Sequence, residues 1–394
     1  MGDAAAKTGN IYAVMAAATT WVLARMLTQP VYPLYVRGLG ATPLQIGMLM
    51  SLTSALPLIL QIPLTLVAER VGKTRMLIFG LVIASTANLM YAYAGSFGQL
   101  PLIIAYAAFT AGFNQLAMSI VSDIAPATSQ GEAIGRYLTF LGVGMLLGPA
   151  LCSILVASLS YSQLFLISAA IPVLGIAILL VWAPKVPGVT TRVERPKVGA
   201  RESLGMILRN RNVMLLSYCR LSFSTAQSLF ITLFSIYATE DLGMTASTVA
   251  LLFTLRGLTN VLIRYPAGRL SDRIGRKKPI IAAFSALTVA FLITATQRSI
   301  LLLGVAMAIY GLSWGTRAVT EWALLTDLVE PEIKTISMSY LSSIFGLGST
   351  LGSTLAGVLS LYLPFTTIFL IAAAIIVPAI PVISTMKRPE AREV

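Results

Sequence analysis

Apolar runs of about twenty residues recur along the whole chain. A helix needs about 20 mostly apolar residues to cross the hydrocarbon core of a membrane. A window of that length finds twelve such runs, at 11–36, 44–68, 76–95, 100–122, 137–159, 163–183, 213–238, 247–267, 279–296, 299–325, 336–362 and 365–385. Composition agrees, because 57% of the 394 residues are hydrophobic and only 11% are charged. We expect an all-α integral membrane protein whose first run is a retained span, since it is too long for a signal peptide.

The distribution of Lys and Arg predicts how the spans are oriented. With the N-terminus inside, Arg37 and Arg298 are the two basic residues of the outer loops, and five Arg fall within spans. The remaining 21 of the 28 basic residues then lie in inner loops and tails, which is the bias of the positive-inside rule. We therefore expect both termini in the cytoplasm and the chain in the plasma (inner) membrane. Because the basic residues alternate with apolar runs, we expect no nucleic-acid partner.

The residue types exclude several chemistries. The chain has no His, and Cys152 and Cys219 both fall in apolar runs. We therefore expect neither a metal centre nor a disulfide framework. No phosphate-binding loop or nucleophile motif is present, so we expect no cofactor, no enzymatic activity and no use of ATP.

An internal repeat divides the chain. The segment LGATPLQIG at 39–47 is echoed by LGMTASTVA at 242–250, and AERVGKTR at 68–75 is echoed by SDRIGRKK at 271–278, both at an offset of 203. A basic, Pro-rich stretch at 184–212 separates the two copies and suits a cytoplasmic linker beside anionic headgroups. We predict an N-terminal six-helix bundle at 1–183, the linker at 184–212 and a C-terminal bundle at 213–394, related by pseudo-symmetry.

The second copy of the repeat carries the most specific motif. GRLSDRIGRKK at 268–278 resembles the cytoplasmic signature of the major facilitator superfamily. TQPVYPLYVRGLGATPLQIG at 28–47 is similar to the end of the first span and the following loop in the drug/proton antiporter branch. The resemblance implies the major facilitator fold, two six-helix bundles that work by alternating access. In the family this signature loop latches the two halves, which implies a gating role for Gly268, Asp272, Arg273, Gly275 and Arg276, and for Glu69, Arg70 and Gly72 in the first copy. The first copy departs from the pattern, with Thr65 for the leading Gly and Glu69 for Asp.

A third motif and one departure bear on coupling. GMLLGPALCS at 144–153 resembles the antiporter signature of the fifth span, which implies gating by Gly144, Gly148 and Pro149. Because small residues also let helix backbones touch, a packing role explains this motif nearly as well. The drug-exporting branch usually carries an Arg in the fourth span, where this chain has Ala108.

Charged residues inside the spans mark the candidate site. A charge at the bilayer centre costs at least about 2.5–3.5 kcal/mol, so it should face a cavity or a partner. The five Arg are Arg25, Arg220, Arg256, Arg264 and Arg317, and Glu321 is the one deeply placed carboxylate. Helical spacing groups them with polar and aromatic neighbours, and the predicted solute-binding or coupling residues are Arg25, Gln29, Tyr32, Asn114, Arg256, Asn260, Trp314, Arg317 and Glu321. Two alternatives remain: Arg317 and Glu321 form a structural pair, and Arg220 and Arg264 reach toward the membrane surface.

These charges favour an anionic solute. Guanidinium groups bind carboxylates and phosphates through forked donors. We therefore expect a secondary transporter that exports or exchanges a small anionic or amphipathic organic solute, with Glu321 carrying a coupled proton and a monomer as the working form. The alternative within transport is proton-coupled multidrug efflux, an antiporter function. A membrane enzyme or non-transporting sensor has no supporting motif.

Overall fold

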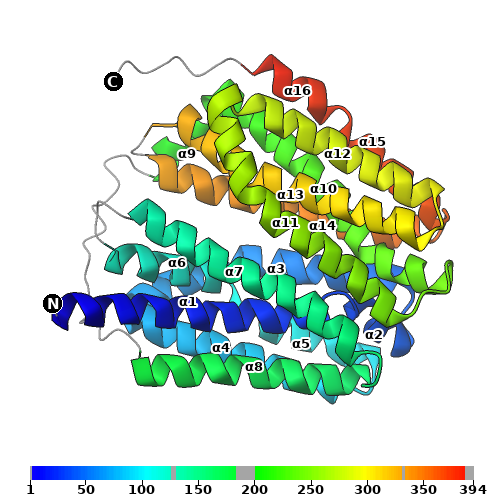
Figure 1. Ribbon diagram of the computed structural model, residues 1–394, viewed down its shortest axis with the longest axis horizontal. Coiled ribbons are helices and arrows are strands. Elements are labelled where there is room, and N and C mark those ends of the chain that lie inside the picture. The colour runs from blue at the N-terminus through cyan, green and yellow to red at the C-terminus, as the bar shows by residue number, and fades with distance from the viewer. Residues whose placement is uncertain (1, 126–129, 183–199, 331–332, 387–394) are drawn as a thin grey trace. The chain divides into compact units, whose positions relative to one another are not determined.

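The computed structural model describes residues 2–125, 130–182, 200–330 and 333–386, and every regular element among them is a helix (Figure 1). In the first half these are α1 (Gly2–Thr28), α2 (Tyr32–Gly38), α3 (Pro43–Val71), α4 (Lys73–Ala92), η1 (Phe97–Gln99), α5 (Leu100–Ala107), η2 (Ala108–Thr110), α6 (Phe113–Ile124), α7 (Gln130–Leu155) and α8 (Tyr161–Trp182). The second half contains α9 (Ala200–Arg209), α10 (Arg211–Glu240), α11 (Ala246–Ile274), α12 (Lys277–Thr296), α13 (Ile300–Leu328), α14 (Lys334–Leu359), α15 (Phe365–Ile376) and α16 (Ala379–Thr385).

Twelve segments of the described chain are long and apolar enough to cross a membrane, which confirms the predicted number of spans. Three of the predicted spans are not single helices. The first is interrupted at 29–31, before α2, and the last is interrupted at 377–378, before α16. The prediction of one continuous helix at 100–122 is also wrong, because the fourth span consists of α5, η2 and α6. The interruption in this span lies at Gly112, whose φ of 80° is in the left-handed region that favours glycine.

The repeated LGxT segments are helix caps. The side-chain oxygen of Thr42 accepts a hydrogen bond from the Gln45 backbone N–H at 3.3 Å, and the Thr42 N–H donates to Gln45 Oε1 at 2.8 Å. This reciprocal pair is a capping box at the start of α3. At the equivalent place before α11, the Thr245 hydroxyl accepts from the Thr248 N–H at 3.2 Å. The sequence echo therefore has a local cause, since both copies satisfy free N–H groups at a helix start.

The chain divides into two compact units by its contacts. Unit 1 comprises Met1–Gly188 and Ser235–Thr254, and unit 2 comprises Val189–Phe234 and Leu255–Val394. The assignment of separate bundles to 1–183 and 213–394 stays a prediction, and residues 183–199 of the predicted linker lie outside the described residues. The rest of that linker includes a helix, α9.

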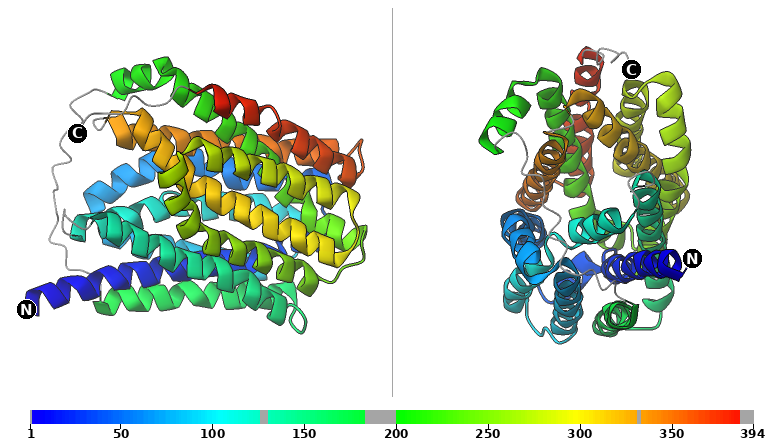
Figure 2. Two further views of the ribbon diagram at one scale, coloured as in Figure 1. Left: turned by 45° about the horizontal axis from the view of Figure 1, so that its top comes forward. Right: turned by 90° about the vertical axis from the view of Figure 1, so that its left-hand side faces the viewer.

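In unit 1, α1 packs along α7 and α8, and α8 packs along α4 (Figures 1 and 2). Helix α7 approaches α1 closely at Gly148, since a Cβ added there would lie only 2.7 Å from the backbone of Met26. Gly144 also faces α1, because a Cβ added to it would lie 3.1 Å from both Thr19 O and Leu23 N. Small residues thus let two helix backbones touch and fix the position of α1.

In unit 2, α12 packs along α13 and α15. Phe230 of α10 lies at the centre of an aromatic cluster, with ring centres 4.6 Å from Phe291 and 5.1 Å from Phe369. All three rings are at most 1% exposed. Aromatic packing of this kind holds three helices of unit 2 together through large buried area.

Candidate functional site

A cavity of about 260 Å³ lies inside unit 1, among α1, α3, α4, α5 and α8. The predicted residues Arg25, Gln29 and Tyr32 all line it. Arg25 is exposed, and its guanidinium carbon lies 5.7 Å from the ring centre of Trp21, which is also a lining residue. The cavity therefore presents a cation beside an aromatic face, an arrangement suited to a solute with a charged end and a planar body.

The wall of the cavity is polar on some sides and aromatic on others. Its polar residues are Thr28, Gln29, Thr53, Asn88 and Thr110, and its aromatic residues are Trp21, Tyr32, Tyr91 and Phe165. None of the residues lining this cavity is Asp or Glu. The local charge is therefore positive, and a cationic solute would find no opposite charge on this wall.

The aromatic wall is fixed by its own contacts. The rings of Tyr32 and Tyr91 meet edge to face with centres 5.7 Å apart, and Tyr91 stacks on Phe165 at 5.3 Å. The hydroxyl of Tyr35 donates to the Tyr91 carbonyl oxygen at 2.6 Å. A wall held in this way is preorganised, which reduces the entropy lost when a solute binds.

Asn114 is not one of the residues that line this cavity. Its side-chain oxygen accepts a hydrogen bond from the hydroxyl of Tyr137 on α7, so the amide joins two helices. By contrast, Thr53, Asn88 and Tyr91 line the cavity but are absent from the predicted set. The sequence offers little signal for Thr53 and Asn88, because single Ser, Thr and Asn residues are common in helices that pack inside membranes.

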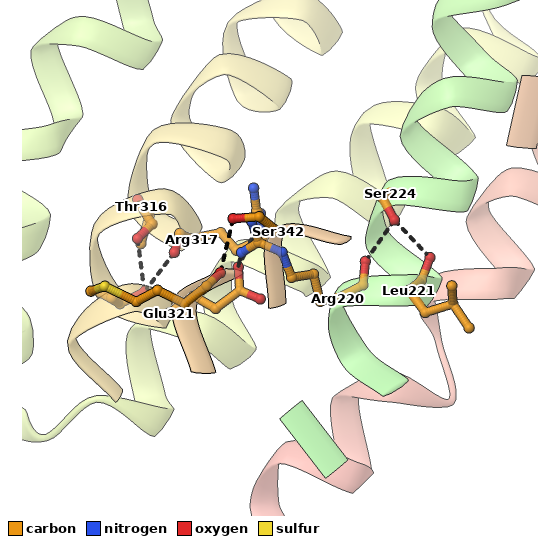
Figure 3. Close-up of polar contacts among 9 residues, drawn as sticks. Arg220, Leu221, Ser224, Thr316, Arg317, Glu321 and Ser342 are labelled. Carbon is orange, nitrogen blue, oxygen red and sulfur yellow. Dashed lines mark hydrogen bonds and ion pairs between the residues drawn. The ribbon is translucent and has the colours of Figure 1, made fainter. Parts of the chain in front are cut away.

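Unit 2 holds a buried group of charges, which we call the charge triad: Arg220, Arg317 and Glu321 (Figure 3). Arg220 Nη1 lies 3.0 Å from Glu321 Oε2, and Arg317 pairs with the same oxygen. The three residues are 6%, 3% and 2% exposed. Arg317 and Glu321 therefore do form the intrahelical pair that their spacing suggests. The alternative that Arg220 extends to the membrane surface is wrong, because it is buried against Glu321.

Aromatic rings surround the charge triad. The guanidinium of Arg220 lies 4.5 Å from the centre of the Trp322 ring, and that of Arg317 lies 4.2 Å from Phe223. The triad carries two positive charges and one negative charge, so a net charge of +1 remains buried. Cation–π attraction stabilises part of this excess.

The other predicted residues of unit 2 form a third group. Arg256 lies 5.3 Å from the ring centres of both Tyr310 and Trp314. The Asn260 side chain donates to the Gly311 carbonyl oxygen at 3.5 Å. Arg256 and Asn260 are 3% and 1% exposed, so they are packed between α11 and α13. The nine predicted residues are thus divided among the cavity, the charge triad, this packed group and Asn114, which is bonded to Tyr137.

One glycine in each signature loop has a positive φ. Gly72 and Gly275 have φ values of 107° and 87°, a range that favours glycine at the end of each helix. A Cβ on Gly268 would meet Val319 of α13 at 3.4 Å. Arg70 and Arg273 are exposed, and the Glu69 side chain lies outside the described part of the chain.

At each turn a cation forms an ion pair with a later helix of its own unit, α6 in unit 1 and α13 in unit 2. In unit 1, Lys73 Nζ lies 2.6 Å from Asp123 Oδ2. In unit 2, Arg276 pairs with Asp272 and lies 3.2 Å from Asp327. Partial burial acts to lower the pKa of Arg276, but its hydrogen bonds to the two carboxylates outweigh this effect and raise the pKa. The guanidinium therefore stays charged as the bridge between α11 and α13.

Comparisons with known proteins agree with this architecture. The family model described as Major Facilitator Superfamily matches residues 14–237 and 216–394. An uncharacterised MFS-type transporter of Methanocaldococcus jannaschii is 22% identical over 382 residues, covering 93% of this chain and 97% of its own. The multidrug resistance protein MdtG of Klebsiella pneumoniae is 24% identical over 375 residues, covering 93% and 90%.

Two solved structures share the fold. The nucleoside transporter NupG aligns with a TM-score of 0.77 and 15% identity, covering 97% of this chain and 98% of that one. A bacterial homologue of the human lysosomal transporter Spinster aligns with a TM-score of 0.75 and 17% identity, covering 96% and 95%. With the family model matching nearly all of it and its twelve spans in the same fold, the chain belongs to the major facilitator superfamily and is a membrane transporter, not an enzyme.

Proposed function

We propose that this transporter is a secondary active carrier that exports or exchanges a small amphipathic organic anion, bound in the cavity of unit 1 with its anionic group on Arg25. The observation that carries the proposal is an exposed guanidinium in a cavity whose lining contains no carboxylate. A charge-assisted hydrogen bond to a carboxylate contributes about 1.5–3 kcal/mol. Gln29, Tyr32 and Asn88 line the same cavity and offer further donors.

The size of the cavity supports a small solute. Its volume of about 260 Å³ lies just below the range of about 300–1,000 Å³ that is usual for drug-sized ligands. Its aromatic rings offer apolar faces to the body of the solute. A monocarboxylate with one or two rings fits both features.

The proposal includes a working cycle. The chain alternates between two conformations in the plasma membrane, as a monomer with both termini in the cytoplasm, and the two signature loops and the Gly144–Pro149 segment take part in gating. Coupling to a proton at Glu321 remains part of this proposal. The positive-inside distribution of charge supports the orientation.

The second candidate is proton-coupled multidrug efflux. It is favoured by the similarity to the multidrug resistance protein MdtG of Klebsiella pneumoniae and to the quinolone resistance protein NorA of Staphylococcus aureus, which is 23% identical over 241 residues. The lack of an acidic residue in the cavity wall favours the anion carrier instead.

The charge preference of the cavity can be measured without knowing the solute. In a Cys152→Ala/Cys219→Ala background, Thr53→Cys places one thiol in the cavity wall. Its reaction rates are measured with sulfonatoethyl methanethiosulfonate, an anion, and trimethylammonioethyl methanethiosulfonate, a cation. We expect the anion-to-cation rate ratio to exceed that of Ser96→Cys, an exposed loop control, and to fall on the order of tenfold when Arg25→Gln is added. A ratio that does not respond to Arg25→Gln would refute the role of Arg25.

A binding assay tests the solute class. Thermal unfolding of the purified protein is measured with benzoate and 2-naphthoate and with their neutral amides, benzamide and 2-naphthamide, because a ligand stabilises the fold that binds it. We expect the acids to stabilise the protein more than the amides, and Arg25→Gln to remove the difference. Stabilisation by the cation rhodamine 6G and not by the acids would support multidrug efflux instead.

A further inference from the structure

One side of the cavity in unit 1 is built by three neighbouring elements. Helices α3 and α5 and the short helix η2 contact one another, and together they contribute seven lining residues. Among these seven, only Thr53 of α3 and Thr110 of η2 have polar side chains. We call this part of the wall, the lining residues of α3, α5 and η2, the threonine side. Its hydrogen-bonding character therefore depends on two hydroxyl groups and on the backbone beside them.

The hydroxyl protons of both threonines are used within the protein. Thr53 Oγ1 donates to the Met50 carbonyl oxygen at 2.7 Å, and Thr110 Oγ1 donates to the Ala107 carbonyl oxygen at 2.8 Å. A hydroxyl group has one proton and two lone pairs. Each threonine therefore has only a lone pair left to offer a solute, so both hydroxyl groups act as acceptors toward the cavity.

The backbone of α3 adds an acceptor at the same place. Pro57 lies inside this helix and also lines the cavity. Because proline has no N–H, it cannot donate the helical hydrogen bond to the carbonyl oxygen four residues earlier, which belongs to Thr53. Thr53 therefore contributes two oxygens that accept hydrogen bonds, one from its side chain and one from its main chain.

An anionic group is unsuited to the threonine side, because a carboxylate itself only accepts hydrogen bonds. A carboxylate bound to Arg25 of α1 therefore leaves the threonine side to another part of the solute. If that part is a plain hydrocarbon, the oxygens of Thr53 and Thr110 lose their hydrogen bonds to water without replacement, and polar groups left unpaired in this way lower the affinity. A substituent with an O–H or N–H group restores these bonds.

We propose that the solute carries, besides its anionic group, a hydroxyl or amino group that donates a hydrogen bond to the threonine side. The solute then belongs to the class of hydroxy- or amino-substituted aromatic acids. Thr53, Pro57 and Thr110 distinguish such a solute from one of the same size without a donor. This inference rests on the proposed function in taking the cavity as the solute site, whereas the preference for a donor does not depend on the anion.

The test compares solutes that differ in one substituent. Dissociation constants are obtained by titrating the thermal stability of the purified protein with 3- and 4-hydroxybenzoate and with the fluoro and methyl analogues at the same positions. Fluorine is smaller than a hydroxyl group and methyl is slightly larger, and neither donates a hydrogen bond. For at least one position we expect the hydroxy acid to bind about twofold to tenfold more tightly than both analogues. Equal affinities at both positions, or no binding by any of these compounds, would overturn the proposal.

Valine variants assign the preference to the two hydroxyl groups. Thr53→Val and Thr110→Val each replace a hydroxyl by a methyl group of similar size, and the double variant should lose most of the preference for the hydroxy acid. The matched control is Thr65→Val on the same helix as Thr53. Its hydroxyl donates to the Gln61 carbonyl oxygen at 2.8 Å, but the residue does not line the cavity, so this variant should keep the full preference. A preference that survives in the double variant would refute the role of the threonine side.

A proline variant tests the main-chain acceptor. Pro57→Ala gives α3 the missing N–H and is expected to fold, because alanine favours a helix. It should weaken the preference for the hydroxy acid. Pro63→Ala, inside the same helix but not among the residues that line the cavity, should leave the preference unchanged. Equal effects of the two variants would contradict the role of the Thr53 carbonyl oxygen.

The anion and the donor can fail separately in this experiment. The hydroxybenzamides and fluorobenzamides carry the same ring substituents beside a neutral group. If acids and amides bind equally well, and the hydroxy amides still bind more tightly than the fluoro amides, the anion on Arg25 is refuted and the donor inference stands. If the acids bind more tightly than the amides without any preference for a hydroxyl group, this inference is refuted and the proposed function stands.

Discussion

Neutralising Glu321 is expected to destabilise unit 2 far more than neutralising either of its partners. Glu321 is 2% exposed and pairs with both Arg220 and Arg317. Glu321→Gln keeps the shape of the side chain but raises the net charge of the charge triad from +1 to +2. Arg220→Gln instead lowers it from +1 to zero and leaves the Arg317–Glu321 pair matched.

The magnitude follows from the geometry. At the Arg220–Glu321 distance of 3.0 Å, the attraction between unit charges is about 5.5 kcal/mol at an effective dielectric constant of about 20. The desolvation of the ions offsets much of this attraction in the native protein, but removing one partner leaves the desolvation cost without the gain. Loss of the partner of a buried ion costs about 3–5 kcal/mol. We therefore expect about that loss for Glu321→Gln and a smaller loss for Arg220→Gln, because the Arg317–Glu321 pair stays matched in that variant.

The assay is thermal unfolding of the three purified variants in one detergent, with the Arg220→Gln/Glu321→Gln double variant as the third. The double variant has a net charge of +1 on the triad and should be more stable than Glu321→Gln alone. Wild-type stability of Glu321→Gln would refute this reasoning, whereas a flattened pH dependence of transport in this variant would support the proposed proton coupling at Glu321. Equal losses for Glu321→Gln and Arg220→Gln would also refute it.

Three other predictions concern gating, packing and topology. Asp272→Asn is tested with the benzoate-series acid that stabilises the protein. It should reduce transport of this acid much more than the thermal stabilisation by it, because a latch shifts conformational populations and not cavity chemistry. Equal losses of transport and stabilisation would instead indicate damaged folding. Gly311→Ala should lower the free energy of unfolding by about 1–3 kcal/mol or more, because the added methyl overlaps the backbone of α11, whereas Gly135→Ala on α7, with nothing within 4 Å, should not lower it. Reporters fused after Val394 and inserted near Pro196 should both be cytoplasmic, and an external signal from either would contradict the proposed orientation.

Much of the fold could be predicted because its signals are local. The length of an apolar run depends only on consecutive residues, and the twelve runs match the twelve candidate spans. The turns at Gly72 and Gly275 were predictable for the same reason, since a positive φ there favours glycine whatever surrounds it. The interruption at Gly112 was not predictable, because hydropathy measures how readily a segment transfers into lipid. It does not depend on whether the helix of that segment is continuous.

The candidate site could likewise be predicted only where its signals are local. The sequence determined that Arg25, Arg317 and Glu321 lie at membrane depth and must each face a cavity or a partner, because lipid cannot solvate them. It also determined that Arg317 and Glu321 share a helix face. Only the tertiary structure decided that Arg25 lines a cavity while Arg317 and Glu321 are buried with Arg220. The physical reason is that a cavity exists only where helices from distant parts of the chain fail to touch, and no local pattern of residues records the distance between such helices.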